Sequence, residues 1–544
     1  MSVLDEELQR RLRRPQRHRL LQGFPAVPAM TTATPTSTPP PQFWEPAVQR
    51  RLDGSVVDHA WRAAVAALAA PPFDFDVANG TPEHRANMIA ASERQRQNRE
   101  RQGRTVDEGN HGEPPYLTID STRGLIVGVI PHTQCIPRTE GCGFCTFPHD
   151  VANTRSRNEM VDTVTDELAA LCASDGVVGR RVDAIYLGGG TANLSSSEQI
   201  GRLVATIGGE LRIDEAELTL EGTPQLFAAW FGEHLKNLAR QPVAQKRISM
   251  GIQTFDDGFL RRMGREKFGD ASTVRKLIKR CRELSITTSG DFLFNLPGQT
   301  AAQMDHDVAM AVGLGLDQIC LYNLVLYEGL GTPWSKDPAL VAVMPDNDAA
   351  CANWLRLRRL LLSAGYVQST LTNFERADVA AGPGRFRYEV DSFSPEAFDG
   401  IGSGPMSISS VVDWPAQRAI KLLRRKNIRG PAWSGGDLMY RYERDDLRLL
   451  FVIRSLAKTA FSTTTYASLF GTRFADDFAA VVAVLGAADL IVLDDERCSL
   501  TPRGMFFSDA VVSMLAATRA TVGDGVRTDD LLREHPQAGY LGMG

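Results

Sequence analysis

Between about residues 116 and 334, short apolar segments alternate with amphipathic helical patterns. This alternation predicts repeated βα units that form a parallel sheet, and therefore an α/β fold. Six such units fit a partial (β/α)6 barrel better than an open sheet. The predicted strands are Leu125–Ile130, Asp183–Leu187, Glu217–Leu220, Ile248–Ile252, Thr288–Phe294 and Gln318–Leu324.

Two helix starts in this region have the pattern of a capping box, in which a hydroxyl and a side chain three residues later satisfy free backbone amides. They are Ser195 with Glu198 and Thr300 with Gln303. A third helix pattern places Cys281 on its apolar face, so we expect that thiol to be buried.

Polar or glycine residues lie within or just beyond the C-terminal half of five successive predicted strands. In a parallel barrel this rim builds the active site, so the sequence predicts a site there. The residues are Cys135, Gly188, Gly189, Gly190, Glu221, Gln253 and Asp291.

Three cysteines, Cys135, Cys142 and Cys145, occur in the segment GVIPHTQCIPRTEGCGFCTFPHD. Thiolates select zinc, Cu(I) or an iron–sulfur cluster, and a [4Fe–4S] cluster with three protein ligands leaves one iron open. Tetrahedral zinc with His132 or His149 as fourth ligand is the alternative. No second C-x2-C pair is present, which favours the cluster.

A run of three glycines follows the second predicted strand in Ala184–Asn193 (AIYLGGGTAN). Such a run lets the backbone approach a ligand closely and offers amides to it. The segment lacks the G-x-x-x-x-G-K-[ST] of a phosphate loop and the G-x-G-x-x-G of a dinucleotide site. We therefore expect a ligand that is not held by its phosphates.

These segments, together with LTLEGTP, RISMGIQTFDDGFLRRMGRE, GDFLFNLPGQT, LYNLVLYEGLGTPW and FDGIGSGPMSIS, resemble the radical S-adenosylmethionine enzymes over roughly residues 120 to 520. More narrowly, the chain looks like the coproporphyrinogen III dehydrogenase-like branch. The resemblance implies a [4Fe–4S] cluster on Cys135, Cys142 and Cys145, with S-adenosylmethionine on the fourth iron. Reductive cleavage of that cofactor would produce a 5′-deoxyadenosyl radical.

The resemblance also implies a set of residues around one or two S-adenosylmethionine molecules: Phe144, Gly189, Gly190, Thr191, Glu221, Gln253, Arg265, Asp291 and Leu324. Arg265 offers a planar fork suited to a carboxylate, and Asp291 can accept from ribose hydroxyls. Two alternatives stay open: a surface ion pair of Arg265 with Glu266 or Asp257, and a purely structural, hydrogen-bonded Asp291.

Three positions depart from the family pattern. The cysteine spacing is C-x6-C-x2-C instead of C-x3-C-x2-C, which cluster binding should tolerate because loop-closure cost grows slowly with length. The lead-in Tyr-x-His-Ile-Pro-aromatic is replaced by GVIPHTQC, which bears on the second cofactor site. Ala192 stands where the family usually has Pro.

Three reactions are compatible with this resemblance. The first is a methyl or methylene transfer in specialised metabolism that uses two S-adenosylmethionine molecules. The second is oxidative decarboxylation of coproporphyrinogen III. The third is a haem-binding chaperone, although no histidine occurs between His306 and His535 to serve as the usual haem ligand.

The remaining regions are predicted less sharply. Residues 1–115 form an N-terminal extension with a Pro/Thr-rich, disordered segment at 26–45, a helix at Asp58–Ala70 and a polar run at Glu93–Arg104. The barrel spans 116–334, and an accessory region spans 335–435. The latter contains a helix over Ala349–Leu362 and an irregular, glycine-rich stretch over Arg385–Ser410.

Residues 436–544 are predicted as a helical, winged-helix-like domain, with helices and then a hairpin over Tyr440–Ala517. The hairpin tip, Asp494 to Glu496, is acidic and would repel phosphates. The net charge of −5 likewise predicts no nucleic-acid binding.

No apolar run approaches the roughly 20 residues of a membrane span, and the N-terminus lacks a signal-peptide core, so we expect a cytoplasmic protein. The expected partners are a small-molecule substrate and, from the resemblance, an electron donor such as flavodoxin or ferredoxin.

Overall fold

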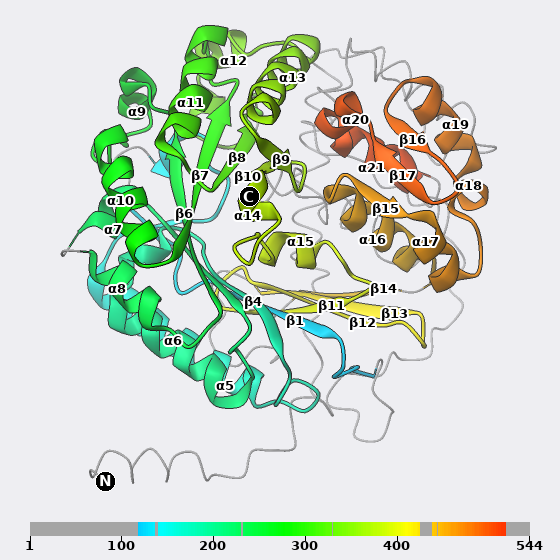
Figure 1. Cartoon of the computed structure of the whole chain (residues 1–544), viewed down its shortest axis with the longest axis horizontal. Helices are drawn as coiled ribbons and strands as arrows, with labels where there is room; N and C mark the ends of the chain where they lie inside the picture. The colour runs from blue at the N-terminus through cyan, green and yellow to red at the C-terminus, as the bar shows by residue number, and fades with distance from the viewer. Residues whose placement is uncertain are drawn as a thin grey trace.

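The computed structural model describes residues 118–136, 140–229, 232–328, 330–424, 438–442 and 444–517. The predictions for the N-terminal extension therefore lie outside the described residues. The expected α/β fold is confirmed: a parallel sheet forms the centre of the structure, and helices cover it (Figure 1).

Six strands of the sheet correspond to the six predicted strands, and neighbouring strands pair in parallel. Each begins or ends within three residues of its predicted bound. In spatial order they are β1 (Gly124–Val129), β4 (Val182–Leu187), β5 (Glu217–Gly222), β6 (Gln245–Gln253), β7 (Ile286–Phe294) and β8 (Gln318–Asn323).

The helices that connect these strands lie on the outer side of the sheet (Figure 1). They are α5 (Thr154–Cys172), α6 (Ser197–Glu210), α7 (Pro224–Ala228), α8 (Glu233–Arg240), α9 (Asp257–Arg262), α10 (Ala271–Glu283) and α11 (Ala301–Leu314). Each of the longer helices buries one apolar stripe; on α10 the stripe includes Cys281, which is fully buried as predicted.

One of the two predicted capping boxes is wrong by one residue. Helix α6 is capped by Ser196 and Gln199, not by Ser195 and Glu198. A short 3-10 turn, η2 (Ala192–Leu194), precedes the helix and ends at Ser195, so the helix starts one residue later than the pattern suggested. The box of Thr300 and Gln303 at the start of α11 is confirmed.

The stretch Arg385–Ser410, predicted to be irregular, contains regular elements instead. They are α15 (Tyr388–Ser392), β11 (Phe398–Ser403) and the start of β12 (Ile408–Asp413). Strand β11 pairs in parallel with β1 over its whole length, from Gly124 opposite Phe398 to Val129 opposite Ser403. The sheet therefore has a seventh parallel strand that comes from the accessory region.

Antiparallel strands extend the sheet at both edges to twelve strands. Beyond β11 lie β12, β13 (Arg418–Leu423) and β14 (Leu438–Tyr442). Beyond β8 lie β10 (Asn373–Arg376) and β9 (Tyr366–Gln368). The accessory region also contains α12 (Pro338–Ala342), α13 (Asn347–Ser363) and α14 (Ala377–Ala380), and α13 confirms the predicted helix over Ala349–Leu362.

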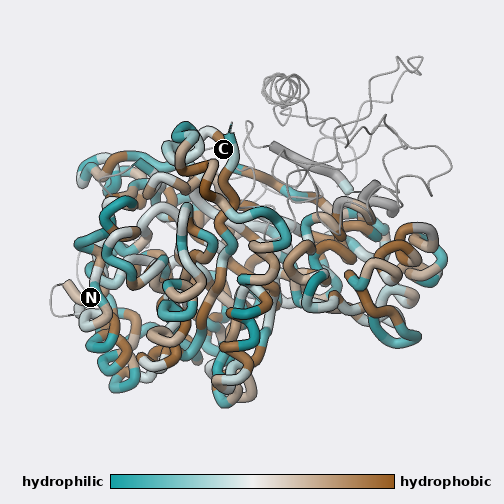
Figure 2. The backbone as a smooth tube through the Cα atoms, turned by 90° about the horizontal axis from the view of Figure 1, so that it is seen from above, coloured by the Kyte–Doolittle hydropathy of each residue, from teal (hydrophilic) through white to brown (hydrophobic). Residues whose placement is uncertain are grey.

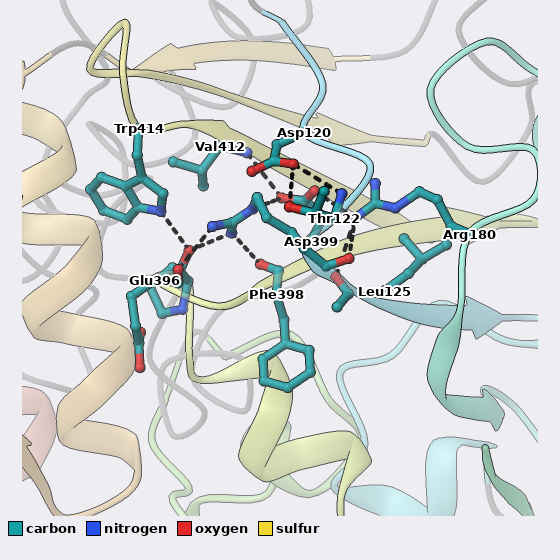
Figure 3. A network of polar contacts seen from close by, with 12 residues as sticks. Asp120, Thr122, Leu125, Arg180, Glu396, Phe398, Asp399, Val412 and Trp414 are labelled. Atoms are coloured by element: carbon teal, nitrogen blue, oxygen red, sulfur yellow. Dashed lines mark hydrogen bonds and ion pairs between the residues drawn. The ribbon is translucent and has the colours of Figure 1, made fainter. Parts of the chain in front are cut away.

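A buried polar network joins β11 to the start of β1 (Figure 3). The carboxylate of Asp399 accepts from Arg123 Nε at 3.1 Å and from Arg180 Nη2 at 3.0 Å. Arg123 also donates to the backbone carbonyls of Pro395, Glu396 and Phe398. This network lies at the N-terminal end of the strands, where polar residues in barrels serve stability rather than catalysis.

The C-terminal region forms a separate three-stranded sheet of β15 (Ala460–Ser462), β17 (Arg497–Leu500) and β16 (Ile491–Leu493). The predicted hairpin is present as β16 and β17. Its helices are α16 (Arg444–Ala457), α17 (Thr463–Phe470), α18 (Phe474–Asp477), α19 (Ala479–Ala487), α20 (Pro502–Phe506) and α21 (Ser508–Ala517). Apolar stretches, brown in Figure 2, run through the interior of this region and of the barrel.

Within the described residues, no helix is both long enough and apolar enough to cross a membrane.

Candidate cofactor and metal site

The cysteine loop follows β1 and folds back on itself. Its two short strands, β2 (Gln134–Cys135) and β3 (Asp150–Val151), pair in parallel. Between them η1 (Glu140–Gly143) places Gly141, Cys142 and Gly143 in the left-handed region, with φ of 52°, 53° and 85°. A non-glycine residue rarely adopts this conformation, so the loop accepts strain at Cys142.

Glycine is required at position 143 because an aromatic side chain covers it. A Cβ atom there would lie 2.0 Å from Nε1 of Trp334, which belongs to η4 (Trp334–Lys336). The ring of Trp334 also packs on Phe144, with 5.7 Å between ring centroids. Cys142 and Leu324 belong to the same apolar cluster, so the predicted residues Phe144 and Leu324 both lie beside the cysteine loop.

The three thiols lie close enough together to interact electrostatically. Burial and, to a smaller extent, the neighbouring Cys142 and Cys145 raise the pKa of Cys135 to about 12, although a hydrogen bond from Thr191 lowers it. Burial likewise raises the pKa of Cys145 to about 11. Without a cation these thiols stay protonated, whereas a coordinated metal deprotonates its thiol ligands outright.

Among the described residues, no group of three His, Cys, Asp or Glu side chains has the geometry to hold a single metal ion. Thiolates on one tetrahedral zinc would lie roughly 4 Å apart, because each Zn–S bond is about 2.3 Å. A cluster distributes its thiolates over separate irons, so it does not require three ligands around one ion. His132 is buried, and its Nδ1 accepts from the Gln134 amide at 3.2 Å.

The glycine loop after β4 packs directly on the cysteine loop. The amide of Thr191 donates to the carbonyl of Gln134 at 2.9 Å. A Cβ atom on Gly190, whose φ is 51°, would lie 2.8 Å from the same carbonyl oxygen. The side chain of Thr191 hydrogen-bonds Cys135. The two loops predicted separately from the sequence thus form one wall.

Glu221, at the end of β5, lies next to this wall. Its Oε2 accepts from the Gly189 amide at 3.4 Å and from the Tyr186 hydroxyl at 3.3 Å. Burial and the nearby Asp291 raise the pKa of this carboxyl to about 7, although these two hydrogen bonds lower it. Glu221 therefore changes charge near neutral pH.

Asp291 lies on β7, two strands away from Glu221 in the sheet. The Ser249 hydroxyl lies 3.3 and 3.2 Å from its two oxygens, and Cys320 hydrogen-bonds it. Burial raises the pKa of Asp291. The residue thus has the partners expected of a structural aspartate, yet it stays half-buried in the C-terminal half of a central strand.

Arg265 is buried, so the alternative of a surface ion pair is wrong. Its Nη1 lies 3.4 Å from Sγ of Cys142, and Nη2 donates to the Gly251 carbonyl. Its Nε is buried without a hydrogen-bond partner. A buried guanidinium with a free donor is suited to an anionic group, because each unmade hydrogen bond costs free energy.

Gln253 ends β6 in the left-handed region, with φ of 72°, after a register shift between Gly251 and Gln253. Such a bulge redirects a side chain at the end of a strand. Gln253, Glu221 and Asp291 remain half-buried although their strands are central in the sheet.

Sequence reasoning missed several residues of this site. Tyr186, Trp334 and Tyr388 contact the predicted residues or each other. Trp334 lies in a segment that carries the family resemblance, and Tyr186 lies two residues before the first glycine of the glycine loop. The local sequence therefore indicated that both could belong to the site. Tyr388 lies in Arg385–Ser410, the stretch predicted to be irregular, and no local sequence feature indicated that it belongs to the site.

The model of the family described as "Radical SAM superfamily" matches residues 137–311, which include two of the three cysteines and four of the six predicted strands. Residues 137–311 are thus identified as a radical SAM domain. Members of this superfamily use a [4Fe–4S] cluster and S-adenosylmethionine.

Curated relatives of this radical SAM protein include a "Heme chaperone HemW" of Bacillus subtilis, 26% identical over 48% of this chain and 66% of that protein. An "Anaerobilin synthase" of Escherichia coli O157:H7 is 30% identical over 36% of this chain and 42% of that protein. The chain therefore matches less than two thirds of the length of each of these relatives.

A solved structure, "Coproporphyrinogen III oxidase (HemN) from Escherichia coli", matches with a TM-score of 0.58. It covers 73% of this chain and 91% of that chain at 19% sequence identity, which supports a shared fold. Together with the curated relatives, this match supports the HemN-like branch that the sequence motifs indicated.

Proposed function

We propose that this protein is a radical SAM enzyme that holds a [4Fe–4S] cluster through Cys135, Cys142 and Cys145. The observation that carries the proposal is the direct contact of the cysteine and glycine loops, through the Thr191 amide on Gln134 and the Thr191 side chain on Cys135. When bound and reduced, the cluster supplies the electron that cleaves S-adenosylmethionine into methionine and a 5′-deoxyadenosyl radical.

In this proposal the chain's own residues bind and orient the cofactor. The glycine loop lets the backbone approach the amino-acid end of S-adenosylmethionine, since Gly189 and Gly190 have no side chains there. Glu221 faces the cationic ammonium and sulfonium groups, and Arg265 faces a carboxylate. Phe144 and Leu324 provide apolar contacts that exclude water.

We infer further that the reaction is a methyl or methylene transfer to a small molecule, with two S-adenosylmethionine molecules bound. Glu221 on β5 and Asp291 on β7 are separated by β6, so their backbones lie about 10 Å apart. Two carboxylates with Gln253 between them are suited to two cationic ligands side by side.

The proposed partners are a small-molecule substrate and a one-electron donor such as flavodoxin or ferredoxin. The test is anaerobic reconstitution with iron, sulfide and dithionite, followed by assay for 5′-deoxyadenosine and S-adenosylhomocysteine. Methyl transfer yields both products. Formation of 5′-deoxyadenosine without S-adenosylhomocysteine in the presence of the true substrate argues against methyl transfer. If neither product forms, the result argues against a radical SAM enzyme.

Cysteine variants test the ligand assignment independently of the reaction. Cys142→Ala is expected to abolish stoichiometric cluster binding, measured as iron and sulfide content and as the EPR signal of the reduced protein. Cys281→Ala is the matched control, because Cys281 is buried in α10 within the apolar core. A Cys142→Ala protein that keeps a full cluster would contradict the assignment.

A haem chaperone is the second candidate, because curated relatives with that name each match 48% of this chain. Its usual ligand is absent from the accessory region, since no histidine lies between His306 and His535. Titration with haemin separates the two: a stoichiometric complex with a Soret shift, without S-adenosylmethionine cleavage, would favour the chaperone. Oxidative decarboxylation of coproporphyrinogen III is tested by carbon dioxide release from that substrate.

A further inference from the structure

Residues 386–389, from the accessory region, enter the inner side of the barrel. Phe386 lies under the guanidinium of Arg247 on β6, with 3.7 Å from Cζ to the ring centroid. The amide of Arg387 donates to Oε2 of Glu217 on β5 at 2.7 Å. In Figure 1 the helix that follows, α15, lies on the side of the sheet opposite to α5 and α6. This segment of the accessory region thus packs against β5 and β6 on the inner side of the barrel.

Tyr388 is the residue of this segment that reaches β1 and β4. A Cβ atom on Gly128 of β1 would lie 2.8 Å from the Tyr388 hydroxyl oxygen, so only glycine leaves room for it. The ring of Tyr388 stacks on the ring of Tyr186, with 4.7 Å between centroids and 30° between planes. Aromatic pairs at such distances are favourable and restrict each other's orientation.

Tyr186 transmits this restriction to Glu221. Its hydroxyl lies 3.3 Å from Oε2 of Glu221, and a Cβ atom on Gly188 would lie 2.5 Å from its ring and 2.6 Å from that oxygen. The ring of Tyr186 and the carboxylate of Glu221 therefore both cover Gly188, the first glycine of the glycine loop. Contacts thus run from the accessory region through two rings to the carboxylate at the site.

We propose that Tyr388 and Tyr186 are positioning residues that hold the Glu221 carboxylate for the cationic end of S-adenosylmethionine, so that the accessory segment sets the cofactor affinity of the barrel. This inference rests on the proposed function, because it assumes that S-adenosylmethionine binds beside the glycine loop.

The expected effect follows from the hydrogen bonds of Glu221. The carboxylate has two donors, Gly189 and Tyr186, to offset burial and the repulsion of Asp291, which together raise its pKa. A hydrogen bond to a charged group contributes about 1.5 kcal/mol or more, equivalent to roughly ten-fold in binding. Loss of the Tyr186 hydroxyl should weaken S-adenosylmethionine binding by about that factor.

The first experiment measures S-adenosylmethionine affinity by anaerobic calorimetric titration of the reconstituted, oxidised protein, in which no cleavage occurs. Tyr186→Phe keeps the ring and should raise Kd roughly ten-fold while iron and sulfide content stay unchanged. Glu221→Gln should raise Kd at least as much. A combined variant should be no worse than Glu221→Gln alone, since both act through one carboxylate.

The second experiment tests the contact with the accessory segment by a suppressor pair. Gly128→Ala places a methyl group against the Tyr388 hydroxyl, and we expect a raised Kd for S-adenosylmethionine. Tyr388→Phe keeps the stacked ring and should by itself raise Kd less than Gly128→Ala does. The double variant removes the clash and should recover the affinity that Gly128→Ala loses, which a general loss of stability would not produce.

Unchanged affinity in both Tyr186→Phe and Gly128→Ala would overturn the inference, as would a Gly128→Ala defect that Tyr388→Phe does not relieve. These failures are distinct from failure of the proposed function. If the wild-type protein with a full cluster binds no S-adenosylmethionine, the proposed function itself is wrong and the inference falls with it.

Discussion

Replacement of Asp399 by asparagine should destabilise the barrel strongly. The Asp399 carboxylate is inaccessible to solvent and lies between Arg123 and Arg180, whose side chains are 8% and 1% exposed. Its Oδ1 also accepts from the amide of Val412 at 3.2 Å. This one side chain thus ties β11 and β12 to the start of β1 and to the turn before β4 (Figure 3).

The magnitude follows from burial. Asparagine keeps the shape but removes the negative charge, and so leaves two buried guanidinium groups without a carboxylate. Removal of one partner from a buried ion pair costs about 3–5 kcal/mol, whereas an exposed pair contributes about 0–1 kcal/mol. Since domains are stable by about 5–15 kcal/mol, Asp399→Asn should remove a large fraction of the free energy of unfolding.

The assay is urea unfolding of the cluster-free protein under reducing conditions, followed by far-UV circular dichroism. The matched control is Glu159→Gln, which removes the charge from the exposed pair of Arg155 and Glu159, 90% and 64% accessible. We expect a clear fall in the unfolding midpoint for Asp399→Asn and almost none for the control. If the two variants unfold alike, the argument from burial is refuted.

Three further predictions concern the site and its supports. Gly143→Ala should lose cluster iron, because a Cβ atom would clash with an indole ring, while Gly179→Ala, which has a similar positive φ but open space, should keep it; full iron content in Gly143→Ala would contradict this. S-adenosylmethionine affinity, titrated from pH 6 to 8, should rise as Glu221 ionises, because the raised pKa of about 7 leaves the carboxyl neutral at lower pH; a flat profile would count against its role, and Glu221→Gln is the control. Ser196→Ala should lower the free energy of unfolding by about 1 kcal/mol through loss of the α6 cap, whereas Ser195→Ala should cost less because its hydroxyl has no partner; equal effects in thermal melts would favour the other capping assignment.

Strands were predictable where the local pattern carried the information. The six barrel strands are apolar runs followed by helices, and parallel strands necessarily bring their carboxyl ends to one rim. For this reason Glu221 and Asp291 could be assigned to a common site without coordinates. Strand β11 escaped prediction because FDGIGS has two glycines and its pairing with β1 connects residues more than 270 positions apart.

By itself the sequence determined the chemistry available to this protein: three thiols on one loop, a glycine run after a strand, and polar residues at strand ends. These are local features, set by residue type and spacing. Tertiary structure alone decided that Arg265 is buried beside Cys142 rather than paired at the surface. It also decided that Tyr388 supports Tyr186, because such contacts depend on how distant segments pack and leave no periodic trace along the chain.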